Sequence, residues 1–150
     1  MYIVAVLLWL MFFPNAPYMI TDLIHIPYLG FNSDFVVKYI AAWFGLAYMT
    51  VGVIFGILAG LFSLDAIIQL VFKTKGRGMT VIAVAAVSIL SGYAIYIGRF
   101  LRFNSWDMFY PVSLIKTLIQ DFSLFTVSFS LLFAAYIAFS YLVFCILKKK

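Results

Sequence analysis

Charged residues are scarce in this sequence, and glutamate is absent from it. Only 10% of its 150 residues are charged, whereas 67% are hydrophobic. A soluble domain is typically about a quarter charged and about half apolar. The composition therefore argues against a soluble globular enzyme and predicts a protein whose main partner is the lipid bilayer.

Cysteine and histidine each occur once, as Cys145 and His25. A lone cysteine has no disulfide partner in the chain, so no disulfide framework and no redox cysteine pair is predicted. The sequence also lacks a nucleophile elbow and a phosphate-binding glycine loop. Its first apolar run is not preceded by a basic residue, as a signal peptide would require. The net charge of +5 needs no nucleic acid to explain it, because the basic residues lie where membrane topology places them.

Four apolar segments make up most of the chain and predict about four spans in one membrane-embedded domain, residues 1–150. A span needs about 20 residues to cross a hydrocarbon core about 30 Å thick. The first segment is shorter, and we expect it to continue past a break at Pro14 and Pro17, or to extend beyond Met1 in a longer relative. The predicted fold is an all-α, polytopic transmembrane helical bundle with short interfacial or re-entrant helices. The four segments cover about residues 2–13, 39–64, 79–98 and 122–147.

Loop charges predict the orientation, because short cytoplasmic loops carry an excess of lysine and arginine. The loop after the second span and the C-terminus together hold six cations against Asp65 alone, and the opposite side holds four cations against four aspartates. Both termini should therefore be cytoplasmic. Asp65 and Gln69 are interpreted as a helix emerging into lipid headgroups on the inner side.

The first polar motif follows the first apolar segment, on the predicted outer side. Asn15 can cap a short helix, which Pro27 would close. On that helix Tyr18, Asp22 and His25 stand at i, i+4 and i+7 and share one face. A carboxylate can orient an imidazole for proton transfer, and the two can hold a metal only with a further ligand. Asp22 and His25 are thus candidate catalytic residues, and Asn15 and Tyr18 candidate ligand-binding residues; a histidine turned outward to water or headgroups is the alternative.

The second polar motif ends the third span with Arg99 and Arg102, three residues apart. Two guanidinium groups on one face could bind a phosphate or a carboxylate, or could equally reach lipid headgroups. Asn104 and Asp107 resemble a helix-capping pair, with Trp106 between them. Arg99, Arg102, Asn104 and Trp106 are candidate ligand-binding residues, and Asp107 is a candidate catalytic residue.

Both motifs are expected at one depth on the outer side, where buried charges should pair. Arg99 or Arg102 with Asp22 or Asp107 is the natural arrangement. A structural ion-pair cluster and a catalytic or ligand site both remain open. No metal and no cofactor is predicted, since a metal would need Asp107 to join Asp22 and His25.

Small residues recur every fourth position in the second span, at Gly52, Gly56 and Gly60. This spacing lets helix backbones approach closely. Packing within the bundle and a homo-oligomer through this ridge are the two alternatives. The same spacing relates Ser130, Ala134 and Ala138 in the fourth span and Ala94 and Gly98 in the third.

The two polar motifs also carry a resemblance to a known family. Residues 13–25 contain Phe-Pro-Asn-Ala-Pro-Tyr followed by Thr-Asp-Leu-Ile-His, and residues 98–107 read Gly-Arg-Phe-Leu-Arg-Phe-Asn-Ser-Trp-Asp. In these long and compositionally rare stretches, the chain resembles the DUF1361 family of uncharacterised bacterial integral membrane proteins, from about Leu8 onward. The resemblance implies a multi-pass protein of the bacterial plasma membrane and brings no established activity.

Two classes of function remain open. In the first, the outer polar cluster binds or acts on an amphiphilic or anionic ligand. His25 would then be the acid/base group or a metal ligand, Asp22 its partner, and Arg99 with Arg102 the anion clamp. In the second, the chain is a non-enzymatic membrane subunit or a small transporter component whose charges are structural ion pairs. The sequence does not decide whether the protein is an enzyme.

Overall fold

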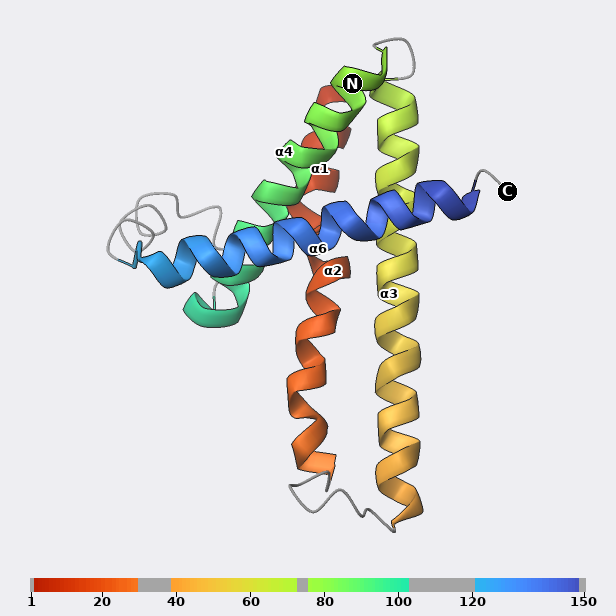
Figure 1. The fold of residues 1–150 in the computed structure, drawn as a ribbon, viewed down its shortest axis with the longest axis vertical. Coiled ribbons are helices and arrows are strands. Elements are labelled where there is room, and N and C mark those ends of the chain that lie inside the picture. Colours follow the sequence, from red (N-terminus) through yellow and green to blue (C-terminus); the bar gives the residue numbers. More distant parts are fainter. Residues whose placement is uncertain (1, 30–38, 73–75, 103–120, 149–150) are drawn as a thin grey trace.

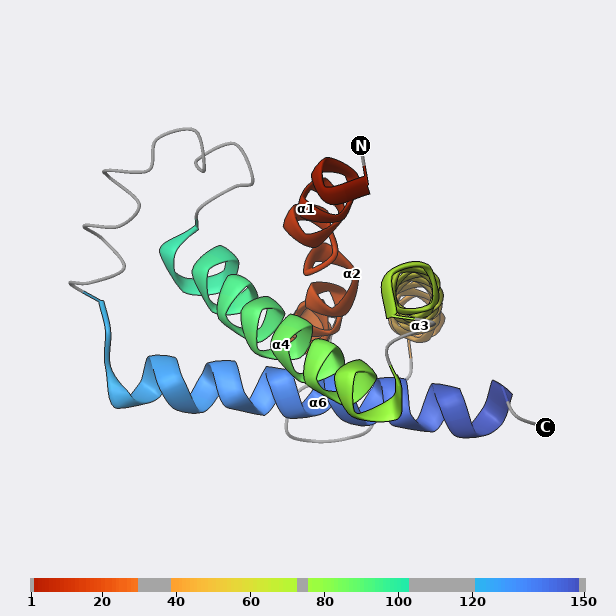
Figure 2. The same cartoon turned by 90° about the horizontal axis from the view of Figure 1, so that it is seen from above.

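The computed structural model describes residues 2–29, 39–72, 76–102 and 121–148, and all regular secondary structure in these residues is helical. Figure 1 shows the helices along the chain, and Figure 2 shows them from above. The helices are α1 (Tyr2–Phe12), α2 (Asn15–Tyr18), the 3-10 helix η1 (Met19–Leu29), α3 (Ile40–Phe72), α4 (Gly76–Tyr96), the π-helix η2 (Ile97–Leu101) and α6 (Leu124–Lys148).

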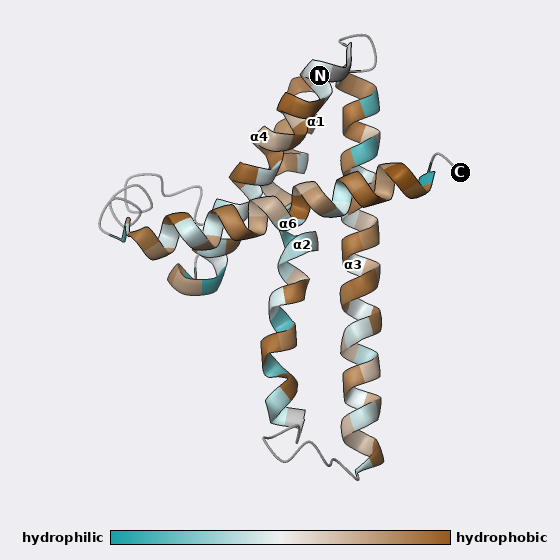
Figure 3. Ribbon diagram, in the orientation of Figure 1, coloured by the Kyte–Doolittle hydropathy of each residue, from teal (hydrophilic) through white to brown (hydrophobic). Residues whose placement is uncertain are grey.

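Four helical segments are long and apolar enough to cross a membrane, which confirms the predicted fold class. Large apolar side chains remain exposed along all of them, and Figure 3 shows hydrophobic colour over most of their length. Such surfaces suit a bilayer, in which the solvent is itself apolar. The second segment continues past residue 64, where the sequence prediction ends it. The four segments are Ile3–Tyr28, Ile40–Val71, Gly78–Leu101 and Leu124–Lys148.

In the first segment, the helix type changes near the prolines. Pro14 occupies the N-cap position of α2, where no side chain caps the helix, and Asn15 is already the first helical residue. The prediction that Asn15 caps this helix was therefore wrong. Pro27 lies inside η1, which ends at Leu29, so it does not close the helix as predicted. Short 3-10 turns are frequent at helix ends, whereas a run as long as η1 is uncommon and often marks a hinge or a sequence under strain.

The glycine ridge of α3 packs against the N-terminal segment of the same chain, which lies beside α3 in Figure 1. A Cβ atom at Gly60 would lie 2.8 Å from the Ala16 side chain, and one at Gly56 would collide with the sulfur of Met19. Glycine at these positions allows the two segments to come close. The contacts support packing within the chain, and the homo-oligomer through this ridge stays a prediction.

The most extensive helix contact joins α4 and α6. A Cβ atom at Gly92 would collide with the backbone carbonyl oxygen of Ser130 and lie 2.9 Å from the backbone nitrogen of Ala134. Ser130 and Ala134 belong to the small-residue repeat predicted for the fourth span. On α4 this close contact is made by Gly92, which the small-residue repeat predicted for the third span does not include.

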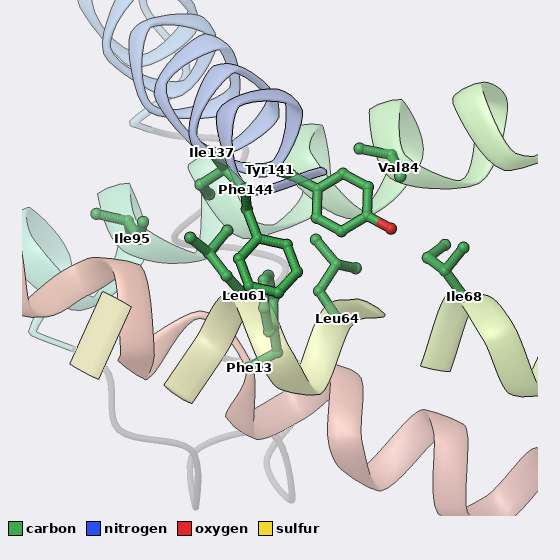
Figure 4. Close-up of a cluster of buried hydrophobic side chains, with 9 residues drawn as sticks. All are labelled: Phe13, Leu61, Leu64, Ile68, Val84, Ile95, Ile137, Tyr141 and Phe144. Atoms are coloured by element: carbon green, nitrogen blue, oxygen red, sulfur yellow. The ribbon is translucent and has the colours of Figure 1, made fainter. Parts of the chain in front are cut away.

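The hydrophobic core lies where α6 crosses α3. Figure 1 shows α6 running steeply across α3, so these two helices meet over a short stretch. There the rings of Phe62 and Phe144 pack edge to face, with their centroids 4.9 Å apart. Figure 4 shows the buried side chains that gather around this crossing: Phe13, Leu61, Leu64, Ile68, Val84, Ile95, Ile137, Tyr141 and Phe144.

Candidate functional site at the two polar motifs

The two polar motifs touch through Tyr18 and Gly98. Tyr18 is the last residue of α2, and Gly98 belongs to η2 at the end of the third span. A Cβ atom at Gly98 would lie 3.6 Å from Cε2 of Tyr18, so the phenol ring rests against the glycine. The N-terminal segment and the end of the third span are therefore neighbours in space.

Asp22 and His25 lie on η1, whose 3-10 geometry changes the predicted face. A 3-10 helix has three residues per turn, so residues i and i+3 are stacked one above the other. Asp22 and His25 remain on one edge, but Tyr18, four residues before Asp22, falls on another. His25 is exposed and its ring lies 5.8 Å from that of Tyr28, centroid to centroid. Among the described residues, no hydrogen bond or ion pair joins Asp22 to His25.

Arg99 and Arg102 lie at the end of the third span, in an unusual backbone segment. Arg99 is half-buried within η2, and Arg102 follows it, exposed, in the left-handed conformation (φ 55°, ψ 29°). A left-handed residue that is not glycine costs about 1–2 kcal/mol, and π-helical turns occur frequently at functional sites. Because neither residue has regular α geometry, the prediction that both share one α-helical face does not apply.

Neither arginine has a carboxylate partner within residues 2–29, 39–72, 76–102 and 121–148. The predicted pairing of an arginine with Asp22 is thus not formed in this structure. Asn104, Trp106 and Asp107 lie outside the described residues, so the placement of these three candidates stays a prediction.

A small crevice lies near the first motif. This crevice, beside Phe13 and Pro17 and closed by Tyr136 of α6, has a volume of about 10 Å³, roughly that of one water probe. No group of three metal-ligating side chains occurs in the described part of the chain, to which Asp107 does not belong.

A polar contact that the sequence analysis missed joins the ends of α4 and α6. The phenol of Tyr96 donates a hydrogen bond to the carboxylate of Asp121. Ser123 and Thr126 form a reciprocal capping box, in which the Thr126 amide donates to Ser123 Oγ and the Ser123 amide to Thr126 Oγ1, both at 3.2 Å. Part of the signal was available, because serine is a favoured N-cap residue and Ser123 directly precedes an apolar run.

Aromatic rings fill the space around this contact. The rings of Tyr96 and Phe100 pack against Phe125 and Phe129 of α6, with centroid distances of 5.0 to 6.3 Å and mostly edge-to-face geometry. Such pairs add about 0.5–1.5 kcal/mol each beyond the area that they bury. They fix the start of η2, and with it the position of Arg99 beside Phe100.

A second polar cluster lies near the C-terminal end of α6, and the sequence predicted only part of it. Asp65 of α3 accepts hydrogen bonds from Gln69 Nε2 at 2.5 Å and from Tyr141 Oη at 3.3 Å, and it forms an ion pair with Lys148 Nζ at 2.5 Å. We call these four residues the Asp65 network. The interpretation of Asp65 and Gln69 as a helix emerging into headgroups did not include the two partners from α6.

The four apolar helices define a multi-pass integral membrane protein. The chain belongs to the family described as "Protein of unknown function (DUF1361)", whose profile matches residues 1–140. This confirms the resemblance seen in the two motifs. Neither a curated protein nor a solved structure matches the chain.

Proposed function

We propose that this protein binds the anionic headgroup of an amphiphile at the site where its two polar motifs meet, with Arg99 and Arg102 as the anion-binding residues. One observation carries the proposal: neither guanidinium group is neutralised by a carboxylate of the described residues. A charged group at membrane depth is costly and is a functional candidate by default. An anionic ligand would supply the missing counter-charge.

The surroundings of Arg99 fit a ligand that is polar at one end and apolar at the other. Phe100 follows Arg99 in η2 and packs against Phe125 of α6, and the two residues are 46% and 55% exposed. The negative end of a helix dipole lies at a helix C-terminus and would repel an anion. The guanidinium groups must therefore provide the attraction, which they do best as bidentate donors to a phosphate or carboxylate.

Asp22 and His25 are proposed as the acid/base pair of this site, acting on the bound amphiphile. Their support is the three-residue spacing on a 3-10 helix, which stacks the two side chains one turn apart. The exposure of His25 leaves its imidazole accessible to a ligand. Asn15 and Tyr18 from the first motif, and Asn104, Trp106 and Asp107 from the second, complete the proposed set.

The alternative is a non-enzymatic membrane subunit or small transporter component whose charges are structural ion pairs. The observation that favours it is the Asp65 network, which is an ion pair of that kind. A homo-oligomer through Gly52, Gly56 and Gly60 would belong to this alternative, but Met19 and Ala16 contact two of these glycines in the chain itself.

Native mass spectrometry of the detergent-purified protein tests the proposal. We expect retention of phosphatidylglycerol over phosphatidylcholine, and at least a tenfold loss of this preference in the R99A/R102A double variant, whereas K148A should keep it. Competition by inorganic phosphate would indicate a site for free anions, whereas an absence of competition would indicate that binding requires the lipid. Equal retention of phosphatidylglycerol by the parent and by R99A/R102A would refute the proposal.

We also propose that both termini lie on the cytoplasmic side of a bacterial plasma membrane, because the whole net positive charge lies on that side. In a C145A background, a cysteine at Ser33 should react with an impermeant thiol reagent in intact cells, and one at Thr74 should not. The reverse labelling pattern would overturn the orientation.

A further inference from the structure

The carboxylate of Asp65 is held inside a membrane-spanning helix and serves no part of the site proposed above. It lies within the segment Ile40–Val71, and only 13% of its side chain is exposed. An ionisable residue in a membrane span is a functional candidate, and its partners indicate the role. Here the partners come from two helices, Gln69 from α3, and Tyr141 and Lys148 from α6.

We propose that Asp65 is a proton-binding site that fastens the C-terminal end of α6 to α3 when charged and releases it when protonated. The charged carboxylate accepts from three donors at once. When Asp65 takes up a proton, its ion pair with the Lys148 ammonium is lost and one oxygen becomes a donor. Lys148 keeps its own proton and, with 49% of its side chain exposed, can turn to water or headgroups.

The geometry allows the C-terminal end of α6 to separate from α3. α6 crosses α3 steeply, so the two helices share only a short contact around Phe144 and the Asp65 network. By contrast, α6 packs along α4 over a long stretch that includes Gly92 and Ser130. Loss of the ion pair should therefore loosen α6 from α3 while leaving it attached to α4.

Asp65 is the group in this cluster that changes charge on acidification. The described groups that face it from α6 are Lys148, Tyr141 and, beside the Tyr141 hydroxyl, the thiol of Cys145. Lysine, tyrosine and cysteine all stay protonated in acid. Val84 of α4, which packs in the same core, carries no charge.

Distances between spin labels in lipid nanodiscs test the proposal with the full chain. In a C145A background, L70C/I146C reports α3 against α6, and L90C/L132C reports α4 against α6; all four positions are exposed. Between about pH 8 and pH 4, we expect the first distance distribution to broaden and lengthen. The second distribution should stay constant.

Charge variants separate proton binding from general unfolding. D65N should show the released distribution at every pH, and K148M should do the same and lose the pH response. Q69A, which keeps the ion pair, should respond as the parent does. An unchanged L70C/I146C distance in D65N would overturn the proposal, and so would broadening of both label pairs in acid, because release is expected at one end only.

Discussion

Two regions of the molecule, the Asp65 network and the two polar motifs, hold polar groups in different ways. In the Asp65 network, a carboxylate, an amide, a phenol and an ammonium satisfy one another across α3 and α6. At the two motifs, Asp22, His25, Arg99 and Arg102 form no ion pair with each other. The Asp65 network joins two helices, whereas the charges at the motifs have no such partner among the described residues. The position of a charge in a membrane helix therefore indicates less about its role than the presence or absence of a neutralising partner.

The largest expected effect comes from disrupting the contact between α4 and α6. Gly92→Ala adds a methyl group that meets the Ser130 carbonyl oxygen, and a backbone atom cannot turn aside as a side chain can. Overpacking of this kind costs about 1–3 kcal/mol. Gly78→Ala in the first turn of the same helix meets nothing within 4 Å and should change stability by less than about 0.5 kcal/mol. Thermal unfolding in detergent compares them, and equal midpoints would show that α4 and α6 do not pack here.

A smaller effect on stability is expected from the capping box at the start of α6. Ser123→Ala removes one half of the capping box at the start of α6 and should cost about 1 kcal/mol. Asn15→Ala should change stability by less than about 0.5 kcal/mol, because Asn15 is exposed and caps nothing. Unfolding midpoints of the two variants check this order. A larger loss for Asn15→Ala would restore the capping role predicted from the sequence.

The Asp65 network should show a measurable coupling. Lys148→Ala is expected to cost about 0.5–1 kcal/mol, since the lysine is half exposed and water screens the pair. A double-mutant cycle of Lys148→Ala with Asp65→Asn at pH 7 isolates the interaction. A coupling energy of zero would place the ion pair among those that contribute nothing to stability.

The smallest expected effect on stability is at the arginines. Arg99→Ala and Arg102→Ala should each lie within about 0.5 kcal/mol of the parent, because neither guanidinium group has a carboxylate partner among the described residues, while lipid retention falls. Thermal unfolding with and without phosphatidylglycerol measures both. A loss of about 3–5 kcal/mol would instead reveal a buried carboxylate partner. The structural ion-pair alternative would then replace the binding site.

Much of the fold follows from the sequence alone. A membrane span must satisfy its backbone polar groups internally, so a long apolar segment has little choice but to be a helix. The number of candidate spans was therefore predictable. The first motif could be located but its geometry could not, because the choice between α and 3-10 geometry around Pro14 and Pro27 depends on packing against α3.

The sequence by itself determined the composition of each helix, the four candidate spans and the two motifs that identify the family. Only the tertiary structure decided which charges are neutralised. Asp65 and Lys148 are 83 positions apart, and Tyr96 and Asp121 are 25 apart. Sequence spacing describes neighbours one or two turns along a helix. Contacts between helices depend on where α6 crosses α3 and on how closely Gly92 lets α4 approach α6, and these follow from packing of the whole chain.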